Sequence, residues 1–312
     1  MDATIPQRVA GGTARPAPTT GRPALASSSD RVLLGGRILR GPYLSRRSTH
    51  SGDGLQRIAY TRAVPATITS CQLTHVAREP IDLDEARRQH ELYESALRMA
   101  GLDVNRVAAR DDLADSVFIE DTAVVFDDVA VLTRPGAASR RGEVDGVREA
   151  LVRHRQLAAI EAPATLDGGD VLVLDRDVFV GLTPRSTISG MQQLRSRLEP
   201  FGYTVRGVPV RGCLHLKSAV TRAGERKLVI NPSWVDPALF EGWETVTIDP
   251  REPFAANVLW LGGTTIVADA FPHTNAILSR HGVTLLPVPA SELAKAEGGV
   301  TCCSLLMTLN DL

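Results

Sequence analysis

Five segments of the sequence share one pattern, in which an apolar run typical of a β-strand leads into a proline. They are residues 59–65, 131–135, 178–184, 228–232 and 266–272. β-branched and aromatic residues favour strands, whereas proline cannot donate to a strand ladder and ends it. Five such modules in one chain predict a closed ring of repeats rather than an open sheet. In a ring, loops from every module converge on the axis, so catalytic groups far apart in the sequence can meet there.

Helical patterns lie between several of these segments. Asp82, with Glu85 three residues later, has the form of a capping box, which predicts a helix over residues 82–99. Apolar residues at helical spacing predict two more helices, over 143–158 and 186–198. Short apolar runs predict strands, among them 58–64, 104–107, 123–126, 129–133, 171–174 and 178–181. The sequence therefore predicts an α/β fold.

Residues 1–57 differ in composition from the rest of the chain. They are rich in Arg, Ser, Gly, Pro, Ala and Thr and nearly free of acidic residues. Their longest apolar run, residues 32–34, is too short for the core of a signal peptide. We expect a disordered extension or a start codon assigned too early, with a transit peptide as the alternative. Residues 58–312 are then expected to form a single catalytic domain.

Charge and cysteine content exclude several classes of protein. The net charge of −1 argues against a nucleic-acid partner, which requires a basic face. No apolar run approaches the ~18 residues of a membrane span, so we expect no membrane partner. The four cysteines, at positions 71, 213, 302 and 303, fit neither a disulfide framework nor a zinc finger. Free thiols favour a reducing, cytoplasmic location.

Two adjacent cysteines near the C-terminus are the candidate nucleophiles. Cys302 and Cys303 follow a Gly-Gly turn, and glycine allows the close approach of a ligand to the backbone. A thiol becomes a nucleophile where its surroundings favour the thiolate. The alternative is two small buried hydrophobic residues on a terminal strand.

Carboxylates around an apolar core form a second candidate group, between Asp115 and Asp121. If this segment is a strand, side-chain alternation places Asp115 and Asp121 on the same face. Two carboxylates beside Phe118 suit a planar cation such as guanidinium, which offers forked N–H donors and a flat face. The alternative is a solvated strand end.

Isolated polar residues supply the remaining candidates. Asp167 precedes two glycines and either caps a turn or orients a histidine. His215, between two leucines, is either a general base or a buried histidine with satisfied hydrogen bonds. Arg140, Arg141 and Arg185 either clamp a carboxylate or are solvated.

The order of these motifs resembles that of the dimethylarginine dimethylaminohydrolase family. The chain carries Asp-x5-Asp with Phe between, then Leu-Asp-Gly-Gly-Asp, then Leu-His-Leu-Lys-Ser, then Thr-Cys-Cys-Ser. The family belongs to a superfamily that modifies guanidino groups and includes arginine deiminases and amidinotransferases. The resemblance covers residue 58 to the C-terminus. It implies a five-bladed α/β propeller of ββαβ-type modules, the pentein fold. It also implies a small-molecule substrate, no metal, no organic cofactor, and a monomer or homodimer.

The resemblance further implies residue roles. Cys302 would attack the guanidinium carbon of a methylated arginine and form a covalent thiouronium-type intermediate. His215 would protonate the departing dimethylamine or methylamine and then activate the water that yields citrulline, while Asp167 orients His215. The implied substrate contacts are Asp115, Phe118 and Asp121 at the guanidinium, Arg140 and Arg185 at the α-carboxylate, and Leu73, Glu120 and Ala296 at the amino end.

Two other functions remain open from the sequence. The first is an arginine deiminase or another guanidine hydrolase, although deiminases generally carry an extra helical insertion. The spacing between Gly142 and Thr165 leaves room for one helix only. The second is a non-catalytic thiol or metal-binding protein using Cys302, Cys303 and His215, for which the sequence supplies no clear set of three or four ligands.

Overall fold

The structure, a computed structural model, describes residues 55–310. These residues contain five three-stranded sheets. The strands are β1 Leu55–Thr61, β2 Asp103–Arg106, β3 Ala123–Val125, β4 Val129–Leu132, β5 Gln156–Ala159, β6 Val171–Leu174, β7 Asp177–Leu182, β8 Thr204–Pro209, β9 Val220–Arg222, β10 Lys227–Ile230, β11 Glu244–Thr247, β12 Leu259–Trp260, β13 Thr265–Ala268, β14 Leu285–Val288 and β15 Leu305–Asn310. The α-helices are α1 Leu83–Met99, α2 Val144–Leu151, α3 Ile188–Leu198, α4 Leu216–Ala219, α5 Pro272–Arg280 and α6 Ser291–Ala294.

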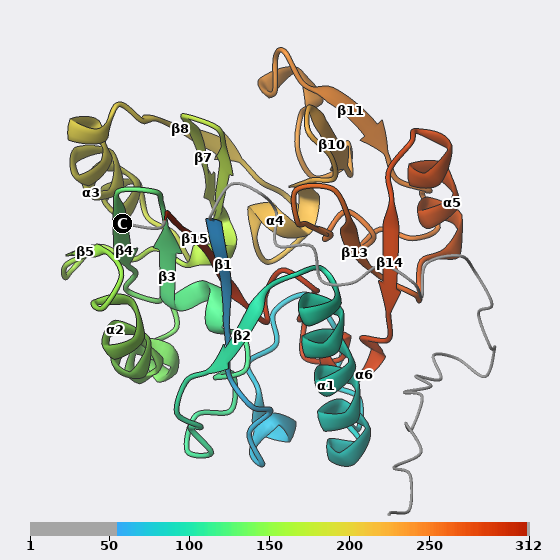
Figure 1. Ribbon diagram of the computed structural model, residues 1–312, viewed down its shortest axis with the longest axis horizontal. Coiled ribbons are helices and arrows are strands. Elements are labelled where there is room, and N and C mark those ends of the chain that lie inside the picture. Colours follow the sequence, from blue (N-terminus) through green and yellow to red (C-terminus); the bar gives the residue numbers. More distant parts are fainter. Residues whose placement is uncertain (1–54, 311–312) are drawn as a thin grey trace, which may run out of the picture. The chain divides into compact units, whose positions relative to one another are not determined.

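The five sheets share one topology. In each, the middle strand pairs antiparallel with one neighbour and parallel with the other, as in β3-β4-β5 and β6-β7-β8. A parallel pair needs a crossover, which α1, α2, α3 and α5 provide in four modules. The module of β9, β10 and β11 uses only the short 3-10 helix Pro237–Leu239. Figure 1 shows the modules following one another around a common centre. The predicted five-module α/β propeller is confirmed.

The two ends of the described chain form one blade together. β15 pairs antiparallel with β1, with Met307 opposite Ile58, and β1 pairs parallel with β2. β1 begins at Leu55, three residues before the predicted start. The rest of the predicted N-terminal extension lies outside the described residues. Ring closure therefore depends on the last strand reaching the first.

In the modules whose crossover is an α-helix, core side chains lie between the sheet and that helix. In α2, Val147 and Leu151 are buried against Ala130 and Leu132 of β4. In α3, Leu194 and Leu198 occupy the same place in the next module. Burying one such side chain contributes about 1.5–3 kcal/mol, so helical spacing of apolar residues fixes which face turns inward.

Of two predicted helices, one is present as expected and one is shorter than predicted. The helix predicted over 82–99 is α1, and the Asp82 carboxylate accepts from the N–H groups of Asp84 and Glu85. The helix predicted over 143–158 is too long, because α2 ends at Leu151 and residues 156–159 form β5. The apolar residues of this segment satisfy both periodicities, and pairing with β4 makes it a strand. Within residues 55–310, no helix is long and apolar enough to cross a membrane.

Ring closure can be tested at β15. Met307 is 5 % exposed against the first blade, so Met307→Ala should lower the free energy of unfolding by about 2–5 kcal/mol. The neighbouring Thr308 faces solvent, and Thr308→Ala should change this free energy by less than about 0.5 kcal/mol. Urea denaturation measures both, and equal effects would contradict the inward packing of β15.

Candidate active site

One pocket is lined by residues from six separate stretches of the chain. Eight of the eleven predicted site residues line it, namely Asp115, Phe118, Asp121, Arg140, Arg185, His215, Ala296 and Cys302. The other three behave differently. Asp167 does not line the pocket but is hydrogen-bonded to the ring of His215. Leu73 is next to the pocket residue Gln72 in sequence, and Glu120 lines another cavity.

The sequence analysis treated the segment that carries Asp115 and Asp121 as a strand, and the structure shows that it is not one. It is a series of turns that ends in the 3-10 helix Ile119–Thr122. The N–H of Phe118 donates to the carbonyl of Asp115 at 3.0 Å, and that of Asp121 to the carbonyl of Phe118 at 3.3 Å. Turns of this type advance three residues per repeat, so Asp115, Phe118 and Asp121 share one side. The two aspartates therefore face the same pocket, but through a period of three rather than two.

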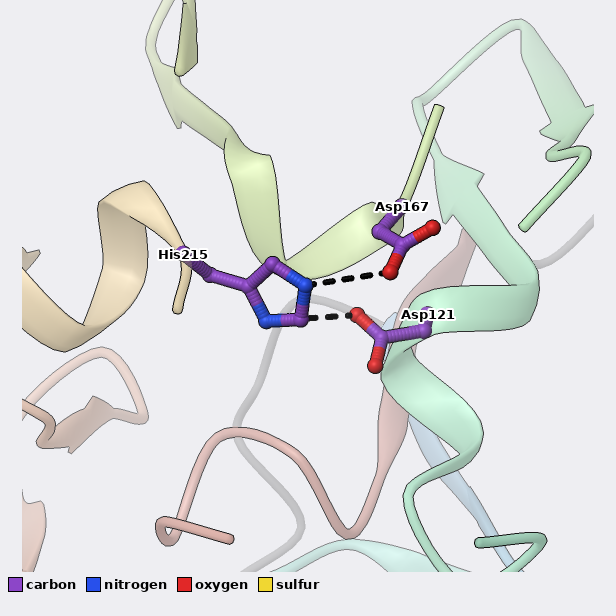
Figure 2. A group of neighbouring side chains, drawn as sticks. All are labelled: Asp121, Asp167 and His215. Atoms are coloured by element: carbon purple, nitrogen blue, oxygen red, sulfur yellow. Dashed lines mark hydrogen bonds and ion pairs between the residues drawn. The ribbon is translucent and has the colours of Figure 1, made fainter. Parts of the chain in front are cut away.

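His215 is held by a buried aspartate. Its Nε2 lies 3.1 Å from Oδ2 of Asp167, and its Nδ1 lies 3.9 Å from Oδ1 of Asp121 (Figure 2). Asp167 is fully buried, and its other oxygen accepts from the N–H of Gly136 at 2.7 Å. His215 is the N-cap residue of α4, so the start of this short helix places the ring. The predicted pairing of Asp167 with His215 is present in the structure.

Gly169 explains one glycine of the Leu-Asp-Gly-Gly-Asp motif. A Cβ atom at this position would lie 2.5 Å from Nδ1 of His215 and 2.8 Å from Oδ1 of Asp121. Any larger residue would therefore push the imidazole and the carboxylate away from their places. The N–H of Gly169 also donates to Oδ1 of Asp121 at 2.8 Å, which fixes that carboxylate.

The acids around His215 set its charge. Burial alone would lower the pKa of His215, but the charges of Asp121 and Asp170 and the hydrogen bond to Asp167 outweigh it and raise the pKa to about 9. Burial acts on Asp121 in the opposite sense, yet the charges of His215 and Arg140 lower its pKa to about 2. At neutral pH the pair is therefore an imidazolium beside a carboxylate.

The two predicted carboxylate-binding arginines differ in availability. Arg140 is 4 % exposed, with Nη1 2.5 Å from Asp121 and with Nε and Nη2 bonded to Glu143 at 3.1 and 2.8 Å. Its guanidinium fork is thus occupied by protein carboxylates. Among residues 55–310, the side chain of Arg185 has one hydrogen bond, of 3.3 Å to the hydroxyl of Thr74, and a 3.9 Å approach to Asp167. Of the two, Arg185 is the cation with donors free for a ligand.

Glu120 binds protein groups rather than facing the pocket. Its carboxylate lies 2.5 Å from Nζ of Lys217 and accepts from the hydroxyl of Thr301 at 2.8 Å. It lines a separate cavity of about 330 Å³ between the inner strands of the sheets. Its backbone N–H donates to the carbonyl of Cys302 at 3.1 Å. These bonds attach Glu120 to the loop that carries the thiol.

The structure separates the two adjacent cysteines. Cys302 is partly exposed, lines the pocket, and its sulfur accepts from the N–H of Gly299 at 3.3 Å. Cys303 is buried, with its sulfur 3.8 Å from the carbonyl of Gly299. Burial, followed by the charges of Glu120 and Asp121, raises the pKa of Cys302 to about 12. Without a ligand the thiol of Cys302 is therefore protonated at neutral pH.

Three residues of the site were not assigned roles from the sequence. Asp170 closes the Leu-Asp-Gly-Gly-Asp motif and accepts from the N–H of Leu216, next to His215, at 3.0 Å. Glu297 begins the Gly-Gly turn at a φ of 60° and accepts from the N–H groups of Thr74 and Val76, both at 2.9 Å. Asp170 lies inside the Leu-Asp-Gly-Gly-Asp motif, and Glu297 directly precedes the Gly-Gly turn that leads to Cys302. Asn257 lies outside every motif, and only its contacts in the fold reveal it.

One group of described side chains is close enough to share a metal ion. Ligand atoms of Asp121, Asp167 and His215 lie within 4.8 Å of one another (Figure 2). Neither cysteine belongs to this group, in contrast to the metal-binding alternative. Both carboxylates already have protein partners, since Asp167 is bonded to His215 and Gly136, and Asp121 to Gly169 and Arg140.

The electrostatics predict the titration of His215. Its imidazole should titrate near pH 9, and Asp167→Asn should lower that pKa because it removes a charged acceptor. NMR titration of the ring protons measures this, with Asp128→Asn, at an exposed carboxylate, as the control. Since the folded pKa is above the ordinary 6.5, the stabilisation from this group is complete below pH 6.5 and lost as the pH rises through about 9. A wild-type imidazole titrating near 6.5 would contradict this account.

Comparison with known proteins supplies the family. No protein-family profile matches the chain. The N(G),N(G)-dimethylarginine dimethylaminohydrolase of Streptomyces coelicolor is 42% identical over 234 residues, covering 74% of this chain and 90% of that protein. The enzyme of the same name from Pseudomonas aeruginosa is 31% identical over 226 residues, covering 72% and 89%.

A solved structure agrees with these relatives. It is a cysteine-to-serine mutant of the Pseudomonas aeruginosa enzyme complexed with citrulline. Its TM-score is 0.76 at 28% identity, over 80% of this chain and 98% of that one. With the fold, the paired His215 and Asp167, and the pocket thiol already described, these similarities place the chain in the dimethylarginine dimethylaminohydrolase family.

Proposed function

We propose that the protein hydrolyses a guanidino C–N bond of Nω,Nω-dimethyl-L-arginine to give L-citrulline and dimethylamine. Nω-monomethyl-L-arginine would give methylamine instead. The observation that carries the proposal is the convergence of Cys302, His215 and two aspartates on one pocket. The names of the relatives, and the citrulline bound by one of them, support the same reaction.

The two aspartates suit the guanidinium group of the substrate. Asp115 and Asp121 both line the pocket, and Phe118 lies between them in sequence and beside them in space. Guanidinium is a poor electrophile because its charge is spread over three nitrogens, and carboxylates that bind chosen N–H groups localise that charge. Burial raises the pKa of Asp115, although Arg140 opposes this, so a cation at the site favours its ionised form.

The chemistry begins with a protonated thiol. The pKa of Cys302 is about 12 without substrate, raised by burial. A bound cation replaces the negative surroundings of the sulfur with positive charge and lowers this pKa. The thiol then releases its proton to water, and the thiolate attacks the guanidinium carbon to form a tetrahedral adduct. A carbon–nitrogen bond of the adduct breaks as the imidazolium of His215 gives its proton to the departing amine, which leaves a thiouronium on Cys302.

His215 then acts in the reverse sense. As a neutral imidazole after the first step, it takes a proton from water, whose oxygen adds to the thiouronium carbon. The carbon–sulfur bond breaks as the added hydroxyl loses its proton, which forms the carbonyl of citrulline, and the departing thiolate takes up a proton to regenerate the thiol. General acid–base assistance of this kind contributes about 10²–10⁴-fold to the rate. Asp167 holds the ring for both steps through its 3.1 Å bond to Nε2.

The amino acid end of the substrate is assigned to the outer part of the pocket. Arg185 would bind the α-carboxylate, and the backbone at Leu73 and Ala296 the α-amino group. Arg140 would contribute by holding Asp121 in place, with its Nη1 2.5 Å from the Asp121 carboxylate. Glu120 would contribute by holding the loop that carries Cys302, through its backbone N–H. These assignments modify two of the contacts expected from the resemblance, because the side chains of Arg140 and Glu120 are already bonded to protein partners.

The pocket must open to admit this substrate. Its volume is about 20 Å³, which is room for roughly one water molecule. Next to the pocket residue Gln72, the N–H groups of Thr74, His75 and Val76 donate to the carboxylate of Glu297, which also lines the pocket. The proposed function therefore requires lining residues to move when the substrate enters.

A matched pair of cysteine variants tests the nucleophile. Cys302→Ser should abolish release of citrulline and dimethylamine, because a serine hydroxyl is a far weaker nucleophile here. Cys303→Ser should retain most activity, because Cys303 is buried outside the pocket. Equal loss in both variants would contradict the assignment. Release of ammonia from arginine, with no amine from dimethylarginine, would instead identify a deiminase.

The covalent step has a direct test. Mass spectrometry of protein mixed with dimethylarginine and quenched rapidly should find a thiouronium adduct on the peptide containing Cys302. In His215→Ala the second step lacks its base, so any adduct that forms should decay more slowly than in the wild type. An adduct on Cys303, or faster turnover in His215→Ala, would overturn the mechanism.

A further inference from the structure

Asn257 joins the two loops that carry the thiol and the imidazole. Its Oδ1 accepts from the N–H of Thr301 at 3.0 Å, and Thr301 precedes Cys302. Its Nδ2 donates to the carbonyl of Lys217 at 3.0 Å and to the hydroxyl of Thr301 at 3.0 Å. Lys217 lies in α4, whose N-cap residue is His215. One amide therefore bridges the segments on either side of the reacting atoms.

The contacts of Asn257 define its chemical requirements. It is 9 % exposed, and its side chain uses two donors and one acceptor at once. An aspartate would present a lone pair to the carbonyl of Lys217 and a second charge near Glu120. Gly299 lies directly against this amide, because a Cβ atom on Gly299 would be 2.3 Å from Oδ1 of Asn257. The asparagine amide supplies both donors and the acceptor without repulsion.

Gly299 links this amide to the sulfur itself. Its N–H donates to Sγ of Cys302 at 3.3 Å, and its carbonyl accepts from the N–H of Cys302 at 3.1 Å. The side chain of Asn257 thus lies against the turn that supports the thiol.

The segment that holds Asn257 is itself firmly attached. The hydroxyl of Thr221 donates to the carbonyl of Ala256 at 2.6 Å and accepts from the N–H of Val258 at 3.1 Å. Thr221 belongs to β9, which directly follows α4. The bridge is therefore anchored to a strand, as precise placement of reacting groups requires.

We propose that Asn257 is a positioning residue, which sets the place of the Cys302 loop relative to His215. The inference rests on the proposed function for its kinetic consequence. A displacement of reacting groups by about 1 Å can lower a rate about 100-fold. The groups assigned to substrate binding lie elsewhere, so the loss should fall on kcat rather than on KM.

The test compares Asn257→Ala with Asn231→Ala. Asn231 is also a buried asparagine; it donates to the carbonyl of Pro253 at 3.0 Å and accepts from the N–H of Ser233 at 3.0 Å, and within residues 55–310 its side chain has no hydrogen bond to Lys217 or Thr301. We expect kcat for dimethylarginine to fall about 100-fold in Asn257→Ala, with KM within about 3-fold. Asn231→Ala should keep kcat within about 3-fold at a comparable loss of thermal stability. Equal loss of kcat in both variants, or an unchanged kcat in Asn257→Ala, would overturn the proposal.

A second measurement needs no turnover. Alkylation of Cys302 by iodoacetamide, located by peptide mass spectrometry, should be roughly 5-fold faster in Asn257→Ala, because a loosened loop exposes the thiol and lowers its pKa. An unchanged alkylation rate overturns the proposal. If the wild type releases neither citrulline nor amine, the proposed function fails, while alkylation still decides the role of Asn257. If Asn257→Ala does not fold, the isosteric Asn257→Asp is judged by the same two measurements.

Discussion

The pairing of the last strand with the first is the constraint on which the active site depends. β15 follows the thiol loop directly, and its ladder with β1 returns the C-terminal segment to the first blade. The carboxylates of residues 115–121 follow β2 in that same blade and precede β3. Closing the ring therefore brings Cys302 beside Asp115 and Asp121, more than 180 residues earlier in the chain. Such long-range pairing costs loop-closure entropy, which the packing of five similar modules must offset.

The pocket gathers more charge than a protein interior ordinarily tolerates. His215, Arg140, Asp121, Asp167, Asp170 and Glu143 are each nearly or fully buried. Burying an ion is costly unless it is paired and hydrogen-bonded, and each of these has partners within hydrogen-bonding distance. Removing one partner leaves another charge uncompensated. We therefore expect the network to add little to the free energy of unfolding. Its main effect is to favour one arrangement of the site over others.

Much of this fold follows from the sequence, and some of it does not. The five strand-proline segments give the number of modules, because the same local signals recur in each. The predicted C-terminal end of α2 was wrong, because Leu157 and Ala158 fit a helical pattern as well as a strand pattern. Only their pairing with β4 shows that they belong to a strand. The alternation argument for Asp115 and Asp121 was wrong for a similar reason, because hydrogen bonds of the i to i+3 type replace the strand there.

The site shows the same division. Cys302, His215 and Asp167 lie within recognisable motifs, and the fold places all three at or directly behind one pocket. Arg140 is hydrogen-bonded to Glu143, and Glu120 forms an ion pair with Lys217. No local sequence pattern reveals either pair. Asn257 belongs to the same category, since its three partners come from two distant loops.

The relative acidities of the Cys302 thiol and the His215 imidazole determine the order of events in the proposed reaction. The pKa of the imidazole is about 9 and that of the thiol about 12, so at neutral pH both hold their protons before substrate binds. A thiolate–imidazolium pair is therefore not present in the free protein, and unrelated electrophiles meet a weak nucleophile. In the proposed reaction, a cationic substrate would supply the missing positive charge at the sulfur while leaving the imidazolium ready as the acid. Selectivity for guanidinium would then arise partly from activation, because a neutral molecule of the same shape would occupy the pocket without generating the thiolate.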